Sequence, residues 1–329
     1  MQTNTKNKIN ELQLIISKMP LEVCCVTVLP EFGVRWREMS RAVRNARLPM
    51  APASVARILC RHIGKSLPSE EIAEIVSRLR LKLVATQRRT WHVVKLSEQI
   101  CDEPVNVLTS RIPNRVVQAL REARNQRFMT PEVQTVKLGD LIYISIQMVS
   151  DIRQGSVLYV ATPPGEPVAL VSSLHSSLLR ACVQGLGYKK YEDASLNGRD
   201  INSLLRIHNT NHNEHPDFLA NLPEYNIMPV AVRNGIDYTG RKMDQEYASQ
   251  ILGPDPPQLA KLTVTAEKEF FAPEKFNMKM KLTIQLKSED IAKTLQCWAA
   301  KGAILPTSDL FQIFHKIKSN KIHIEADDD

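Results

Sequence analysis

Residues 141–172 read LIYISIQMVSDIRQGSVLYVATPPGEPVALVS, and this stretch decides the fold class. Its β-branched and apolar residues come in short runs separated by turn residues, which is typical of strands. We predict strands over residues 141–149, 156–162 and 167–172, with Pro163-Pro164-Gly165 as the turn between the last two. The middle of the chain is therefore predicted to hold an antiparallel sheet.

Before this sheet, the apolar residues recur at helical spacing. The spacing predicts helices over residues 8–18, 53–65, 69–80 and 113–127, the first ended by Pro20 and the last starting after Pro113. The first three helices predict a small helical bundle over roughly the first 80 residues.

After the sheet we predict a helix over 173–186 and then a loop or linker, RIHNTNHNEHPDF, which has no usable periodicity. The remainder predicts helices over 238–251 and 289–301, with long alternating strands over 259–271 and 278–287. The predicted fold class is α+β, with a helical domain at 1–86, an α/β middle domain at 87–215 and a C-terminal α+β domain with an antiparallel sheet at 225–329.

The composition is that of a globular chain that is neither secreted nor membrane-spanning. The first residues lack the apolar stretch of a secretory signal, and no run approaches the length that crosses a bilayer. The six cysteines, at positions 24, 25, 60, 101, 182 and 297, form no CxxC pair and lie mostly in apolar runs. We expect buried, reduced thiols and a cytosolic or nuclear protein.

The basic residues are concentrated in one part of the chain. Residues 1–130 hold 22 Lys and Arg against 11 Asp and Glu, a net charge of +11, whereas residues 131–329 hold 21 against 24, a net charge of −3. Sixteen of the 22 are Arg, whose guanidinium binds a phosphate through two parallel hydrogen bonds. This asymmetry favours a polyanionic partner for the first part over a merely solvated surface.

Two basic clusters lie within this part. Arg37, Arg41 and Arg44 stand at i, i+4 and i+7, so a helix would place them on one face, flanked by Arg35 and Arg47. The second cluster comprises Arg78, Arg80, Lys82, Arg88 and Arg89, beside Trp91. Together they predict contacts with a nucleic-acid backbone, without signs of base-specific recognition.

The chain carries no recognisable catalytic motif. It lacks GxGxxG, GxxxxGK[ST], GxSxG and HExxH patterns, so we expect no enzyme activity, cofactor or small-molecule substrate. His208, His212 and His215 have spacing that a transition metal can use, but they lie in a polar stretch without paired cysteines. We expect no metal there; a metal-dependent hydrolase would rest on this cluster alone.

The last long strand carries a stripe of alternating apolar residues at Met280, Leu282, Ile284 and Leu286, preceded by Met278. Such a stripe is ordinarily domain core. If the strand lies at a sheet edge, it can instead pair with an edge strand of a partner.

The order of elements and several local patterns resemble the centromere protein N family, subunits of the inner kinetochore. The most specific pieces are LIISKMPLEV, LIYISIQ, SVLYVATPPGEPVALVSS, the GPDPPQL breaker before a long strand, and WAAKGAILPTSDLFQIF. The resemblance implies a pyrin-like helical domain that forms a basic groove for nucleosomal DNA with the adjoining α/β domain. It also implies a C-terminal domain that pairs with centromere protein L, contacts with other inner-kinetochore subunits, and a nuclear, centromeric location with a role in chromosome segregation.

Under this resemblance, Lys18, Arg89 and Arg153 fall where the family places DNA-contacting lysines. Family members that recognise the centromeric histone H3 variant use acidic residues where this chain has Lys6 and Asn10, with Glu11 nearby as a possible substitute. The resemblance therefore implies DNA or nucleosome binding, and it leaves recognition of the histone variant open. A different class stays open: a pyrin-like or death-fold adaptor whose basic surface binds an acidic protein and which self-associates.

Overall fold

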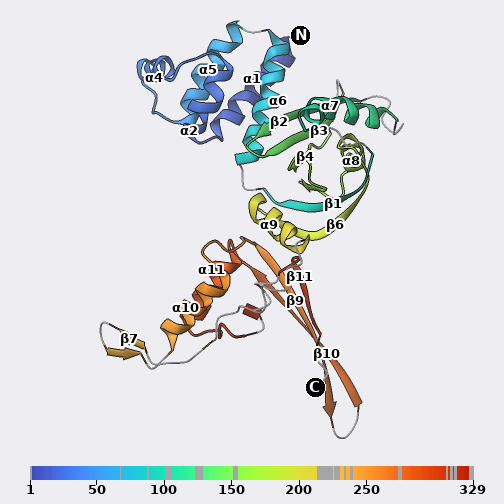
Figure 1. The fold of residues 1–329 in the computed structure, drawn as a ribbon. Helices are drawn as coiled ribbons and strands as arrows, with labels where there is room; N and C mark the ends of the chain where they lie inside the picture. The colour runs from blue at the N-terminus through green and yellow to red at the C-terminus, as the bar shows by residue number, and fades with distance from the viewer. Residues whose placement is uncertain are drawn as a thin grey trace. The chain divides into compact units, whose positions relative to one another are not determined.

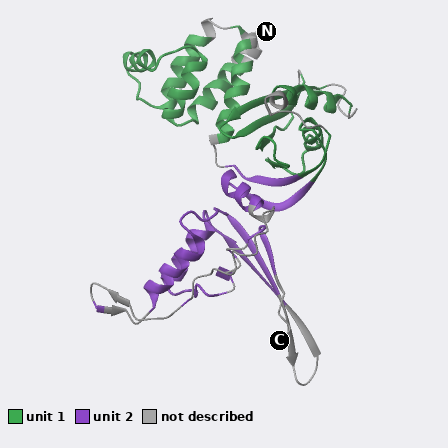
Figure 2. Cartoon of the chain, in the orientation of Figure 1, with its two compact units in different colours: residues 1–88, 96–191 green, residues 89–95, 192–329 purple. Residues whose placement is uncertain are grey.

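A computed structural model describes residues 2–325 except 67, 87–88, 101–104, 123–128, 151–154, 213–224, 226–229, 233–234, 238–239, 273–275, 309, 312–313 and 315–316. The chain forms two compact units, one of residues 1–88 with 96–191 and one of residues 89–95 with 192–329 (Figure 2). Helices and antiparallel sheets confirm the predicted α+β class. The division at 1–86, 87–215 and 225–329 stays a prediction.

The first unit begins with a helical bundle. Its helices are α1 (Gln2–Ser17), α2 (Leu21–Val23), the π-helix η1 (Cys24–Val28), α3 (Leu29–Glu31), α4 (Trp36–Asn45), α5 (Pro52–Ser66) and α6 (Ser69–Thr86). Helices α1, α5 and α6 lie side by side and bury Leu12, Leu59 and Leu79 in one core (Figure 1). The helices predicted over 8–18, 53–65 and 69–80 are confirmed, and each is longer than predicted.

The sheet that follows has six strands in the order β2-β3-β4-β5-β1-β6. The strands are β1 (Trp91–Gln99), β2 (Thr130–Leu138), β3 (Leu141–Val149), β4 (Leu158–Thr162), β5 (Val168–Val171) and β6 (Tyr188–Gly198). Successive pairs from β2 to β5 are antiparallel. The three strands predicted within residues 141–172 are thereby confirmed as β3, β4 and β5. Strands β1, β2 and β6 were not predicted, and exposed residues along most of β6 explain its lack of alternation.

Two helices next to this sheet differ from their predicted bounds. Helix α7 spans Val105–Glu122 with Pro113 inside it, so the prediction that the helix starts after Pro113 is wrong. Ile112 and Val116 are both fully buried, and their burial outweighs the hydrogen bond that proline cannot donate. Helix α8 is shorter than predicted, spanning only Leu179–Gly185.

The predicted linker at 206–218 is wrong as far as residue 212, because Ile201–His212 form helix α9. Asp200 caps this helix, accepting a hydrogen bond from the Ser203 amide at 2.7 Å. Leu204, Ile207 and His208 are buried along one side of α9. Tertiary burial of this face forms a helix from residues whose Asn and His content suggests a loop.

The second unit contains α10 (Arg241–Leu252), β9 (Lys261–Ala272), β10 (Phe276–Lys287), α11 (Ile291–Ala300), β11 (Lys321–Glu325) and the hairpin β7 (Val230–Val232) and β8 (Gly235–Asp237). The predicted helices and both long strands are confirmed. The sheet order is β10-β9-β11, in which β9 and β10 pair antiparallel and β11 joins parallel to β9.

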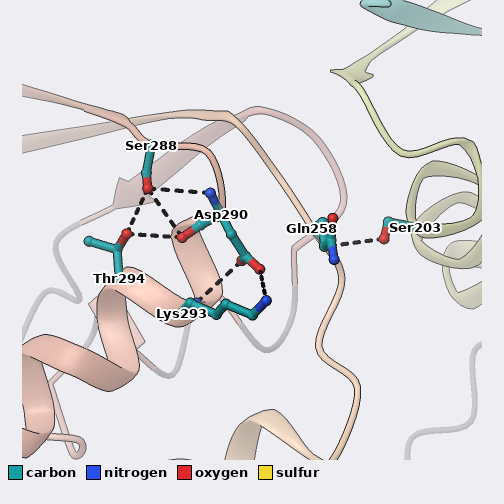
Figure 3. Close-up of polar contacts among 6 residues, drawn as sticks. All are labelled: Ser203, Gln258, Ser288, Asp290, Lys293 and Thr294. Atoms are coloured by element: carbon teal, nitrogen blue, oxygen red, sulfur yellow. Dashed lines mark hydrogen bonds and ion pairs between the residues drawn. The ribbon is translucent and has the colours of Figure 1, made fainter. Parts of the chain in front are cut away.

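Polar contacts define the start of α11 and a link to α9 (Figure 3). Asp290 caps α11 by accepting from the Lys293 amide at 3.3 Å, and the hydroxyls of Ser288 and Thr294 lie 2.7 Å apart beside it. The Gln258 amide donates to the Ser203 hydroxyl at 2.9 Å. The bonds of Ser288, Asp290 and Thr294 therefore set the start of α11 directly after β10, and the Gln258 bond connects the segment before β9 to α9.

Asn320, just before β11, joins two strands through four hydrogen bonds. Its backbone amide donates to the Ser195 carbonyl at 3.0 Å, and its carbonyl accepts from the Thr263 amide at 2.8 Å. Its side-chain oxygen accepts from the Asn197 amide, while its side-chain nitrogen donates to the Lys261 carbonyl. Only 4% of this residue is exposed. Asn320 therefore holds the residue 195–197 part of β6 against β9.

Candidate nucleic-acid interface

The first basic cluster lies on helix α4, as its spacing predicts. The inner face of α4 buries Met39 and Val43 in the helical core. Arg37, Arg41 and Arg44 are exposed, and Arg44 donates from Nε to the Ser40 carbonyl at 3.2 Å. Among the residues that the structure describes, no carboxylate forms an ion pair with these three arginines. Their charges are available to a ligand.

Arg47 ends this helix in a conformation that favours glycine. Its φ of 53° is left-handed. The Arg47 amide donates to the Arg44 carbonyl at 2.9 Å and the Leu48 amide to the Val43 carbonyl at 3.2 Å, which together form a Schellman cap. An L side chain in this region costs on the order of 1 kcal/mol relative to glycine. Arg47 is exposed, so burial of its side chain does not offset this cost.

Helix α5 adds two arginines that the sequence analysis missed. Arg57 and Arg61 stand at i and i+4 and are exposed, and α5 packs against α4. Residues 39–69 contain six Lys and Arg and no Asp or Glu. The same i, i+4 spacing that singled out α4 could have found them. We call the exposed arginines on these two helices, together with the two that flank α4, the α4–α5 arginine set: Arg35, Arg37, Arg41, Arg44, Arg47, Arg57 and Arg61.

The second basic cluster is largely paired inside the first unit. Lys82 Nζ lies 2.8 Å from Glu31 Oε1, and the two side chains are 20% and 21% exposed. Arg78 pairs with Glu31 at 3.3 Å and with Glu74 at 3.1 Å. These carboxylates balance the charges of Arg78 and Lys82 within the fold.

Arg80 joins the helical bundle to the sheet. Its guanidinium donates to Gln147 Oε1 of β3 at 3.0 Å and forms an ion pair with Glu11 of α1. Gln147 in turn donates from Nε2 to the Gly155 carbonyl at 2.9 Å. Glu11, the possible substitute for a histone-binding acid, is therefore engaged with Arg80. Asn10 is exposed, and the side chain of Lys6 lies outside the described residues.

The remaining predicted DNA contacts are scattered or outside the described residues. Lys18 is exposed in the turn after α1. Arg89, in the segment of chain that connects α6 to β1, is half-buried. Trp91 is almost fully buried in the core rather than available for stacking. Arg88 and Arg153 lie outside the described residues.

The predicted partner-binding strand β10 lies at an edge of the described three-stranded sheet, paired with β9 alone. Ile284 is paired with Val264, and residues paired across two strands point to the same face. Val264 is buried, whereas Ile284 is 41% and Leu282 50% exposed. Leu286 is half-buried, and the side chain of Met280 lies outside the described residues. The face that Val264 and Ile284 share is therefore buried at β9 and exposed to solvent at β10.

Of the three histidines with metal-ligand spacing, only His208 has a described side chain. His208 is 3% exposed, and the side chains of His212 and His215 lie outside the described residues. Within the described part of the chain, no group of His, Cys, Asp and Glu is arranged to hold a metal.

Cys24, Cys60 and Cys182 are free and buried as predicted. Cys25 is half-buried, Cys297 is exposed, and Cys101 is outside the described residues. Burial raises the pKa of the Cys60 and Cys182 thiols to about 12. Burial and the neighbouring Cys25 raise the pKa of Cys24 to about 11. These three thiols are protonated and unreactive near neutral pH.

No protein-family model matches the sequence, and no curated protein matches it. No helix in the described part of the chain is long and apolar enough to cross a membrane. The fold and its surfaces thus define an α+β protein with an exposed arginine set in one unit and an open apolar strand edge in the other.

Proposed function

We propose that this protein is a non-enzymatic DNA-binding scaffold subunit of the inner kinetochore, of the centromere protein N kind. Its helical domain, pyrin-like in this proposal, binds centromeric DNA or a nucleosome. Its C-terminal domain forms a heterodimer with centromere protein L and supports kinetochore assembly and chromosome segregation. The observation that carries the DNA-binding part is the α4–α5 arginine set, seven exposed arginines over residues 35–61, a stretch of sequence in which Glu38 is the only acidic residue.

The chemistry of this set favours phosphates over base edges. Guanidinium groups bind phosphate oxygens in pairs, and positive charge spread along two packed helices suits a backbone that carries a charge on every nucleotide. The second basic cluster contributes less in this proposal, because Arg78, Arg80 and Lys82 already have carboxylate partners. The DNA path is therefore centred on α4 and α5.

Salt dependence tests the proposal directly. If the protein neutralises about six phosphates, the logarithm of its association constant for DNA, log K, falls against the logarithm of the salt concentration with a slope of about −5. Fluorescence anisotropy with labelled duplexes of two unrelated sequences measures the slope and the sequence preference together. An affinity that ignores salt overturns DNA binding, and self-association of the isolated helical domain without DNA binding would favour the adaptor class instead.

Arg47→Gly separates stability from binding. Glycine adopts the left-handed conformation of position 47 without strain, so we expect the free energy of unfolding to rise by about 1 kcal/mol. Loss of the guanidinium should at the same time weaken DNA binding about fivefold, for one lost phosphate contact. Thermal unfolding and anisotropy on the same sample check both. Unchanged DNA affinity would remove Arg47 from the interface.

The open edge of β10 supports the heterodimer. Among the described strands, β10 has one neighbour, so its outer backbone groups can pair with a strand of a partner. Leu282 and Ile284 place exposed apolar area on one face beside this edge. A partner strand with an apolar face would cover them.

Ile284→Asp is expected to prevent heterodimer formation while leaving the fold intact, because Ile284 is already substantially exposed in the isolated chain. Size exclusion after co-expression with centromere protein L measures the complex. The matched control is Thr283→Asp, one residue away on the opposite, polar face of the same strand. If both variants still form the complex, the apolar face of β10 is not the interface.

A further inference from the structure

Two threonines in this chain precede a proline, and the structure separates them. They are Thr130 and Thr162, the only Ser or Thr residues followed by proline in the sequence. Proline-directed protein kinases phosphorylate this dipeptide, which differs from other sequences because proline has no backbone N–H. The sequence alone does not distinguish the two positions.

Thr162 is inaccessible. It lies at the end of β4, a strand between β3 and β5, and is buried. Its hydroxyl donates to the Val168 carbonyl at 2.8 Å, so the oxygen that would accept a phosphate points into the sheet. Phosphorylation there would place a dianion in the core.

Thr130 is accessible. It is exposed and begins β2, which is an edge strand of the six-stranded sheet. Its hydroxyl donates to the Val149 carbonyl at 3.0 Å on the surface. Pro131 is paired with Met148, whose carbonyl accepts from the Gly155 amide at 2.8 Å on its other side, so the backbone nitrogen of Pro131 faces the open edge of the sheet and Thr130 lies beside that edge.

The charge around Thr130 makes its modification consequential. The sequence from residue 111 to residue 127 contains five arginines against one glutamate. Arg121, in the last turn of α7, is exposed, and α7 packs against β2. A phosphate adds a charge of about −1.5 to −2 at neutral pH to this basic part of the chain.

We propose that Thr130 is a phosphorylation site of a proline-directed protein kinase, and that its phosphorylation weakens DNA binding. The Thr130 hydroxyl oxygen forms a bond to the γ-phosphorus of ATP. The bond between that phosphorus and the β,γ-bridging oxygen breaks, ADP leaves, and the hydroxyl proton passes to a base of the kinase. The regulatory part rests on the proposed DNA-binding function, whereas the modification itself does not.

The experiment incubates the purified full chain with a cyclin-dependent kinase bound to its cyclin and with ATP, and locates phosphate by tandem mass spectrometry. We expect one phosphate on Thr130. Thr130→Val keeps the β-branched shape and should abolish this modification, whereas Thr162→Val should leave it unchanged. If phosphate is found on Thr162 in preference to Thr130, or on neither threonine, Thr130 is not the phosphorylation site that we propose.

DNA affinity of the unmodified and phosphorylated chains tests the regulation. We expect phosphorylation to weaken binding about fivefold at low salt, with a smaller difference at high salt because the charges are screened. If the unmodified and phosphorylated chains bind DNA equally well, phosphorylation does not regulate DNA binding, although Thr130 is still a phosphorylation site. If the unmodified chain does not bind DNA, the proposed function and its regulation both fail, while phosphate on Thr130 still establishes the site.

Discussion

The variant Arg37→Glu, Arg41→Glu, Arg44→Glu is expected to bind double-stranded DNA about a thousandfold more weakly than the wild-type chain at low salt, for three lost charged contacts of about 1.5 kcal/mol each. These side chains point outward from α4, while Met39 and Val43 hold the helix in the core. The variant should therefore remain folded, and circular dichroism checks that it does.

The same variant should also flatten the salt dependence. Three fewer phosphate contacts reduce the slope of log K against log salt by about 2.7, three times the contribution of one contact to B-DNA. Anisotropy titrations at five or more salt concentrations measure the slope. A lower affinity with an unchanged slope would mean that these arginines act on the fold rather than on phosphates.

A matched control separates position from total charge. Arg180→Glu, Arg199→Glu, Lys287→Glu changes the net charge equally, at three exposed residues outside α4 and α5. We expect this control to lose about tenfold in affinity at most, from the change in net charge alone, against about a thousandfold for the α4 variant. Equal losses in both triple variants would indicate that DNA responds to the net charge of the chain and not to the α4–α5 arginine set.

Asn320→Ala is expected to lower the free energy of unfolding of the second unit by about 2 kcal/mol, because it removes two hydrogen bonds that the buried Asn320 side chain makes to backbone groups. Those groups are the Asn197 amide and the Lys261 carbonyl, both bonded to the Asn320 side chain. The backbone bonds to Ser195 and Thr263 do not depend on the side chain. Urea unfolding followed by fluorescence measures the loss, and Asn202→Ala, at an exposed position on α9, is the control.

Asn320→Asp tests the direction of these bonds. A carboxylate still accepts from the Asn197 amide, but its second oxygen faces the Lys261 carbonyl and repels it. At neutral pH we expect Asn320→Asp to lower the free energy of unfolding at least as much as Asn320→Ala does. Because the protonated carboxyl can donate to that carbonyl, its pKa is raised in the folded state, so stability relative to the wild-type chain should recover as pH falls. Loss that is independent of pH would contradict the assigned donor and acceptor.

Elements rich in apolar residues were predictable from neighbouring residues alone: β3 is a largely apolar run buried on both faces, and α5 carries its buried residues at helical spacing. β3 matches its predicted bounds, and α5 agrees within one residue at each end. α9 and β6 were missed for a physical reason: α9 is polar except at its buried face, and most of β6 is exposed. Pro113 misled the prediction of α7, because a local rule about proline was outweighed by tertiary burial.

By itself, the sequence determined the α+β class, helices α1, α5 and α6, strands β3, β4 and β5, the charge asymmetry and the helical spacing of the α4 arginines. Each of these depends on residues close together in the chain. Only the tertiary structure decided which cations are available. Arg80 meets Glu11 across 69 residues and Lys82 meets Glu31 across 51, so no local pattern reports these pairs. It likewise decided that β10 is an edge and that Thr130, not Thr162, is exposed, because strand order and burial arise from long-range packing.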